Sequence, residues 1–168
     1  MHTFRKTNVV ALVILWATLF SCVQKGHQNQ TLPQGFVYAN ENIPDARLDV
    51  RYYTHDNFLG VPVDGYLAPK VILSNEAALA LEAVADELRN LGYGLILFDG
   101  YRPQKAVNHF VRWARDITDT LTKGKYYPDV DKSLLFELGY IASLSGHSRG
   151  STIDLSLYYL DNGEEVDM

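Results

Sequence analysis

A chain of 168 residues, 47% of them hydrophobic, can bury one sizeable core but is too short to suggest two full domains. Its 15 basic and 20 acidic side chains give a formal net charge of −5, and no basic run could follow a phosphate backbone. We therefore expect one catalytic or binding domain and exclude nucleic acid as an expected partner.

The N-terminus has the features of an export signal. Two basic residues precede an apolar run over residues 9–20, which is shorter than the roughly 20 residues that a bilayer-spanning helix needs. The small residue Ser21 precedes Cys22, the only cysteine of the chain, so an intramolecular disulfide is excluded. The stretch "LFSC" resembles a bacterial lipoprotein box, in which lipids are attached to the cysteine after cleavage. We expect a lipoprotein signal peptide over residues 1–21 and an exported protein, lipid-anchored at Cys22 to a bacterial membrane. An ordinary secretory signal with an incidental cysteine is the alternative.

The next segments predict a tether, an extended region and a helix. Residues 22–35 are polar and typical of a flexible tether, and the folded domain is expected over residues 36–168. Short apolar and aromatic runs alternate with turn residues over residues 48–66, which favours extended segments and loops. Beyond a cap at Ser74 or Asn75, and before a stop at Gly92, apolar residues recur at helical spacing. They are Ala77, Leu81, Val84, Ala85, Leu88 and Leu91.

A buried strand and a second helix follow. The run "LILF", residues 95–98, is apolar on both faces and lies between two glycines, as a central strand would. Pro103 fits the first turn of a helix, and His109 lies off that helix's apolar face. The face is expected to comprise Ala106, Val107, Phe110, Val111, Ala114 and Ile117. A polar loop over residues 118–131 then leads to a short apolar helix expected over residues 134–138.

The stretch "SGHSRGSTIDLSL", residues 145–157, contains the candidate chemistry. Its alternating pattern predicts a strand that turns Ile153, Leu155 and Leu157 to the core and Asp154 to the other face. Gly150 can adopt backbone angles closed to other residues, which would let the turn fold His147 towards Asp154. An imidazole and a carboxylate suit Zn²⁺, which catalytic sites usually hold with three protein ligands. By spacing alone, a turn histidine and a solvated aspartate are the favoured alternative.

The exact residues of this stretch resemble the Ser-x-His-x-x-Gly-x-x-x-Asp signature of the zinc D-alanyl-D-alanine dipeptidases of the vancomycin-resistance type. The stretches "DVRYYTHDNFLGVPVDGY", "LILFDGYRP" and "FELGYIASLSGHSRGSTIDLSL" resemble the same family in the same order. Together they cover most of the chain after the tether. The resemblance implies an α+β fold, the zinc D,D-peptidase (hedgehog-like) fold, with a small, mainly antiparallel sheet flanked by helices.

The resemblance also implies roles for single residues. It makes His147 and Asp154 ligands of a Zn²⁺ cofactor, and Arg102 the active-site arginine that stabilises charge on the attacked carbonyl. Arg102 could instead bond loop carbonyls at the end of the strand. Ser145 resembles a substrate-contacting serine, although a local turn cap is about as well supported by its chemistry. Asp99 and Tyr101, which flank this arginine, are assigned no role beyond shaping the loop.

The chain departs from the family pattern after Asp154. In the family a downstream Glu-x-x-His segment supplies the general base and the third zinc ligand. No such segment occurs before Met168, because neither Glu164 nor Glu165 has a histidine three residues further on. The resemblance therefore suggests a C-terminally truncated member, inactive as it stands. Two other histidines, His55 and His109, match no family ligand position and are not expected to substitute.

For an intact form, the resemblance implies hydrolysis of D-alanyl-D-alanine to D-alanine, in cell-wall peptide metabolism or in glycopeptide resistance. The expected partner is this dipeptide or a related wall peptide. A zinc D,D-carboxypeptidase that trims longer wall peptides is a neighbouring alternative. A non-catalytic remnant that binds wall peptides is an alternative from a different class.

Overall fold

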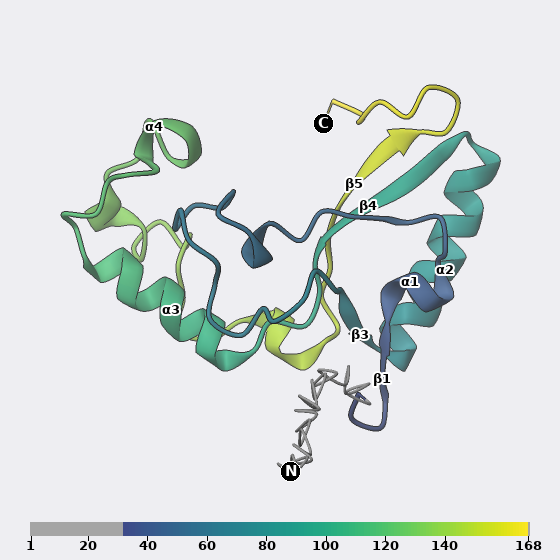
Figure 1. Ribbon diagram of the computed structural model, residues 1–168, viewed down its shortest axis with the longest axis horizontal. Coiled ribbons are helices and arrows are strands. Elements are labelled where there is room, and N and C mark those ends of the chain that lie inside the picture. The colour runs from purple at the N-terminus through teal and green to yellow at the C-terminus, as the bar shows by residue number, and fades with distance from the viewer. Residues whose placement is uncertain (1–31, 168) are drawn as a thin grey trace, which may run out of the picture. The chain divides into compact units, whose positions relative to one another are not determined.

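The computed structural model describes residues 32–167 of the chain (Figure 1). The expected signal peptide, Cys22 and most of the expected tether lie outside these described residues. Among the described residues, no helix combines the length and the apolar character needed to cross a membrane.

The strands form two small sheets. Strand β1 (Phe36–Tyr38) pairs antiparallel with β3 (Ile72–Ser74). Strand β4 (Tyr93–Asp99) is the centre of the second sheet, parallel to β2 (Arg47–Leu48) and antiparallel to β5 (Asp154–Tyr159). With helices beside them, these mainly antiparallel sheets give the α+β fold that the family resemblance implied.

Seven helical elements accompany the strands in the described part of the chain. They are α1 (Ala39–Asn42), the 3-10 turn η1 (Arg51–Tyr53), α2 (Asn75–Asn90), α3 (Gln104–Arg115), α4 (Lys123–Tyr126), η2 (Lys132–Leu134) and η3 (Gly146–Arg149). Figure 1 shows α2 alongside β4, whereas α3 and α4 lie together at the other end of this domain.

The helix predicted after Ser74 is α2, and its start is the expected cap. The hydroxyl oxygen of Ser74 accepts a hydrogen bond from the amide N–H of Ala77 at 3.2 Å. The face that packs on the sheets consists of Ala78, Leu81 and Ala85. Two residues that were expected on the buried face of this helix are exposed instead. Val84 is 47% exposed and Leu91 is 71% exposed, because the first is offset from the buried stripe and the second lies beyond the helix.

The strand predicted over residues 95–98 is confirmed as β4, the most buried strand of the domain. Leu95 and Leu97 belong to a core cluster that also contains Val71 and Leu73 beneath α2. On its other side β4 packs closely against β5, because a Cβ on Gly94 would lie 2.3 Å from the ring of Tyr158. β4 therefore forms a rigid support for whatever side chains follow it.

The second predicted helix is α3, with three differences. Pro103 is the residue before the helix rather than a member of its first turn, since the helix begins at Gln104. Ile117 is 62% exposed because the helix has already ended at Arg115. Trp113, which was not predicted, is buried in its place, since it follows Phe110 by one turn on the same face. The predicted apolar face is otherwise correct in its position.

The short helix predicted over residues 134–138 is wrong. The structure has only the 3-10 turn η2, capped by Asp131, whose carboxylate accepts from the amide N–H of Ser133. Turns follow, and of this apolar run only Leu135 is buried. An apolar run in which one residue packs inward has no helical face to bury, so no helix forms. The preceding loop also contains one unpredicted turn of helix, α4.

Candidate metal centre

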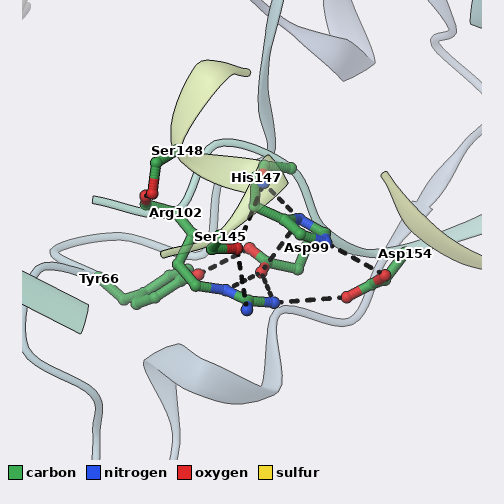
Figure 2. A network of polar contacts seen from close by, with 8 residues as sticks. Tyr66, Asp99, Arg102, Ser145, His147, Ser148 and Asp154 are labelled. Atoms are coloured by element: carbon green, nitrogen blue, oxygen red, sulfur yellow. Dashed lines mark hydrogen bonds and ion pairs between the residues drawn. The ribbon is translucent and has the colours of Figure 1, made fainter. Parts of the chain in front are cut away.

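The candidate site lies where β4 ends and β5 begins. In the antiparallel register of these strands, Asp99 is paired with Asp154, next to an irregularity after Leu97. The segment from Asp99 to Arg102 leaves β4, and η3 with its flanking residues Ser145 and Gly150 leads back towards β5. Figure 2 shows that these two segments bring the side chains of the site together.

Two glycines allow the segments to approach. Gly150 has a φ of +72°, and its amide N–H donates to the carbonyl of His147 at 2.9 Å. Its carbonyl accepts from Ser74 N–H at 2.8 Å, which joins the turn to β3. The expected folding back of His147 by this glycine is thus confirmed. At Gly100 a Cβ would lie 2.5 Å from the carbonyl oxygen of Ile72, so this position also needs glycine.

The contact of His147 with Gly100 selects one tautomer of the neutral ring. Its Nδ1 lies 3.0 Å from the carbonyl oxygen of Gly100, and because a carbonyl can only accept, Nδ1 is the nitrogen that has the proton. Its Nε2 lies 3.4 Å from Oδ1 of Asp154. The lone pair of Nε2 therefore faces the carboxylate of Asp154, and the two repel each other unless a positive charge lies between them.

The geometry of this pair fits a zinc ion. Two ligands about 2.0–2.2 Å from one tetrahedral ion are separated by about 3.4 Å. The hydrogen bond with His147 lowers the pKa of Asp154, and the same contact raises the pKa of His147. Both shifts have the same cause, the hydrogen bond that a proton on Nε2 makes with the carboxylate of Asp154. The expected ligands His147 and Asp154 are thus brought together at a distance that either a zinc ion or a direct ion pair would fit, and their role as ligands stays a prediction.

Asp99 is close to both ligands but is committed to other partners. In the described part of the chain, the one group of three potential metal ligands is Asp99, His147 and Asp154, with ligand atoms within 4.8 Å of one another. Oδ1 of Asp99 accepts from the hydroxyl of Tyr66 at 2.7 Å, and Oδ2 accepts from Arg102. Oδ2 also lies 3.6 Å from Nδ1 of His147, the nitrogen that faces away from Asp154. We therefore assign Asp99 to positioning rather than to the metal.

Arg102 is held with its guanidinium beside the two ligands. Its Nη2 lies 2.7 Å from Asp99 and 3.6 Å from Oδ2 of Asp154. The guanidinium also lies over the rings of Tyr52 and Phe110, with 5.4 and 5.2 Å to their centroids. The alternative role for Arg102, bonding loop carbonyls with its side chain, is not what the structure has. A fixed positive charge next to the ligand pair is suited to stabilising a developing oxyanion.

Ser145 acts as a local cap. Its hydroxyl oxygen accepts from the amide N–H of His147 at 3.3 Å and lies 3.5 Å from Nη1 of Arg102. Its contact with a substrate stays a prediction. The neighbouring Ser148 donates its hydroxyl to the carbonyl of Arg102 at 2.9 Å, a second tie between the two segments that the sequence did not indicate.

Sequence reasoning missed three residues of the site. Asp99 could have been suspected as an acidic residue at the end of a buried strand, three positions before Arg102. Tyr66 and Tyr52 had no local signal, because they come from loop and turn segments far earlier in the chain. Burial raises the pKa of Tyr52 to about 12 and also raises that of Tyr66, which makes both phenols harder to ionise than an exposed tyrosine.

The remaining histidines of the described chain are elsewhere. Neither His55 nor His109 belongs to the group of potential metal ligands around His147. On α3, Nδ1 of His109 accepts from the amide N–H of Asp64 at 3.2 Å, which is a structural contact. The expectation that these histidines do not substitute as ligands agrees with this arrangement.

A histidine nitrogen and a carboxylate at the spacing of two metal ligands, next to a fixed arginine, form a candidate metal site on this α+β fold. The family described as D-Ala-D-Ala dipeptidase matches residues 33–168. The chain belongs to this family, whose members are zinc peptidases.

Three curated relatives are D-alanyl-D-alanine dipeptidases. The chain is 50% identical to the one from Enterococcus faecalis over 137 residues, which are 82% of this chain and 68% of that protein. It is 47% identical to the one from Enterococcus faecium over 134 residues, 80% of this chain and 66% of the relative. It is 45% identical to the one from Streptomyces coelicolor over 129 residues, 77% and 64% of the two chains. The chain thus spans about two thirds of the length of these relatives.

Proposed function

We propose that this protein hydrolyses the peptide bond of D-alanyl-D-alanine, with Zn²⁺ held in part by His147 and Asp154. The observation that carries the proposal is the 3.4 Å separation of Nε2 and Oδ1 in a chain of this family. The substrate class comes from the curated relatives, which are named for the dipeptide.

When bound, the zinc ion would polarise the peptide carbonyl and lower the pKa of a water molecule. The chain's own residues supply orientation and charge. Gly100 holds Nδ1 of His147, so that Nε2 stays free for the ion. Asp99 holds Arg102, whose guanidinium next to Asp154 would stabilise negative charge on the attacked oxygen. Ser145, at the edge of this guanidinium, would contact the bound dipeptide.

We also propose that the protein acts outside the cytoplasm, lipid-anchored through Cys22. The support is the sequence pattern of a short apolar run, a small residue and a solitary cysteine. A dipeptidase in that location would meet fragments of cell-wall peptides. Turnover of released dipeptide and glycopeptide resistance both agree with such a location.

The test is the release of free D-alanine by zinc-supplemented protein. The family resemblance assigns the third ligand and the general base to a segment downstream of Asp154. The assay therefore compares the 168-residue chain with the same chain extended by the C-terminal segment of the Enterococcus faecalis relative. We expect the extended chain to bind zinc and to hydrolyse D-alanyl-D-alanine.

Three controls make the outcome specific. L-alanyl-L-alanine should not be cleaved, and His147→Ala should abolish release from the D,D-dipeptide. A pentapeptide that ends in D-alanyl-D-alanine distinguishes the neighbouring activity, since release from it and not from the dipeptide would indicate a D,D-carboxypeptidase. If the extended chain binds zinc and cleaves neither substrate, the proposed hydrolysis is wrong.

A further inference from the structure

Tyr66 reaches the metal centre from outside the two segments that build it. Figure 2 shows its side chain directed at Asp99, whose carboxylate accepts a hydrogen bond from the Tyr66 hydroxyl at 2.7 Å. Within residues 32–167, Tyr66 makes no hydrogen bond or ion pair with the expected ligands His147 and Asp154. Any effect of the hydroxyl on the site therefore passes through Asp99 and its partner Arg102.

The two oxygens of the Asp99 carboxylate have separate partners. Oδ1 accepts from Tyr66, whereas Oδ2 faces Nε and Nη2 of Arg102 at 2.9 and 2.7 Å. The torsion that turns a carboxylate about its Cβ–Cγ bond is broad, so contacts at one oxygen alone do not fix its plane. Asp99 is 2% exposed, so water has little access to Oδ1. The hydroxyl of Tyr66 therefore keeps Oδ2 directed at the guanidinium.

The loop that carries Tyr66 is anchored to α3. The amide N–H of Asp64 donates to Nδ1 of His109 at 3.2 Å, and Oδ2 of Asp64 accepts from Arg112 at 2.7 Å. Both partners belong to α3, and the amide N–H of Tyr66 donates to the carbonyl of Val63 at 3.2 Å within the loop. The phenol is thus fixed by contacts that do not involve the metal centre, as a residue that orients others must be.

We propose that Tyr66 is a positioning residue of the peptidase, whose hydroxyl orients Asp99 so that Arg102 faces the oxygen on which negative charge develops. The inference rests on the proposed hydrolysis, in which this guanidinium stabilises that charge. Such stabilisation acts in the transition state more than in the substrate complex, so its loss lowers turnover rather than binding. Tyr66→Phe should therefore lower kcat by about 2- to 12-fold, the factor that one net hydrogen bond provides, and leave KM unchanged.

A double-mutant cycle in the extended chain, with D-alanyl-D-alanine as substrate, tests this role. Tyr66→Phe should lower kcat when Arg102 is present and leave kcat unchanged in the Arg102→Ala background. A merely structural role would lower kcat by the same factor in both backgrounds, and that result overturns the proposal. The control is Tyr158→Phe, because the buried hydroxyl of Tyr158 donates to the carbonyl of Asp45 at 3.1 Å, away from the site. It should change neither kcat nor KM.

A second measurement does not depend on hydrolysis. In the 168-residue chain, exchange of the Arg102 Nε–H proton with water, followed by NMR, reports how firmly Asp99 holds the guanidinium. We expect Tyr66→Phe to accelerate this exchange by about 2- to 12-fold and Tyr158→Phe to leave it unchanged. Unchanged exchange in Tyr66→Phe overturns the proposal. Accelerated exchange in a protein whose extended form cleaves no D-alanyl-D-alanine would support the orientation of Arg102 by Tyr66 and reject the proposed hydrolysis.

Discussion

A single carboxylate oxygen of Asp99 accepts a hydrogen bond from Nε of Arg102 at 2.9 Å and forms an ion pair with Nη2 of the same guanidinium at 2.7 Å. Asp99 is 2% exposed, and the side chain of Arg102 is 14% exposed. Burial raises the pKa of Asp99, whereas the charge of Arg102 and the hydroxyl of Tyr66 oppose that rise. The arginine thus depends on a buried partner that is three residues away in sequence.

We predict that Asp99→Asn destabilises the folded chain by about 3 kcal/mol, because it removes the buried counter-charge of a largely buried guanidinium and leaves only the half-exposed Asp154 at 3.6 Å. Urea unfolding measures the change. The matched control is Asp49→Asn, since Asp49 makes a similar 2.8 Å pair with Arg51 where both side chains are 47% exposed. That substitution should cost less than about 1 kcal/mol. Equal losses in the free energy of unfolding at the two positions would show that burial does not make the Asp99–Arg102 pair more important for stability.

Zinc content and turnover should separate the ligands from the arginine in the extended chain. His147→Ala and Asp154→Ala should each lose bound zinc together with activity, since each removes a protein ligand. Arg102→Ala should retain zinc and lose turnover by about hundredfold, as expected for one charge-stabilising donor. Metal analysis beside kinetics provides the measurement. Arg51→Ala, at an exposed arginine, is the control that should change neither. Loss of zinc from the Arg102 variant would assign that arginine to the structure of the site.

Replacing Gly150 by alanine should lower the free energy of unfolding more than the same change at another glycine with a positive φ. In Gly150→Ala the new Cβ would lie 2.5 Å from the ring of Phe36, in addition to the strain of a positive φ. Gly139 has a φ of +79° and no atom within 4 Å of a new Cβ. We expect Gly139→Ala to cost about 1 kcal/mol and Gly150→Ala about 2–4 kcal/mol. Thermal unfolding of the two variants provides the comparison, and equal melting temperatures would contradict the steric argument.

Lipid attachment can be tested through Cys22. In a bacterial host we expect the wild-type protein to partition into the detergent phase and Cys22→Ser to move to the aqueous phase. Ser21→Ala, which keeps a small residue before the cysteine, should partition like the wild type. Detergent-phase partitioning that Cys22→Ser leaves unchanged would remove the lipoprotein proposal.

Local sequence patterns correctly predicted the helix and the strand whose apolar residues pack into the core along the whole element. The helix after Ser74 and the strand that contains Leu95 and Leu97 were predicted because capping, periodicity and burial agreed over a whole element. The apolar run around Leu135 was misjudged, because composition alone does not distinguish an exposed apolar side chain from a buried one.

The site was predicted only in part, because local patterns relate residues that are near each other in the sequence. His147 and Asp154 are near each other in sequence, within a recognisable signature. Tyr66 reaches Asp99 across 33 residues, and Tyr52 contacts the guanidinium from a turn that is still more remote in the sequence. No spacing rule connects such residues, so only the folded chain could reveal them.

The separation of the two segments that meet at the metal centre determines when the centre can form. The contacts that tie them span 47 residues between Gly100 and His147, and 46 between Ser148 and Arg102. A nascent chain leaving the ribosome makes β4 first and must wait for residues 145–159 before the two ligands have their support. Closing such a long loop is also a slow step compared with forming α2. His147 and Asp154 would therefore be in position only after residues 145–159 have been made, and shorter nascent chains would bind zinc weakly.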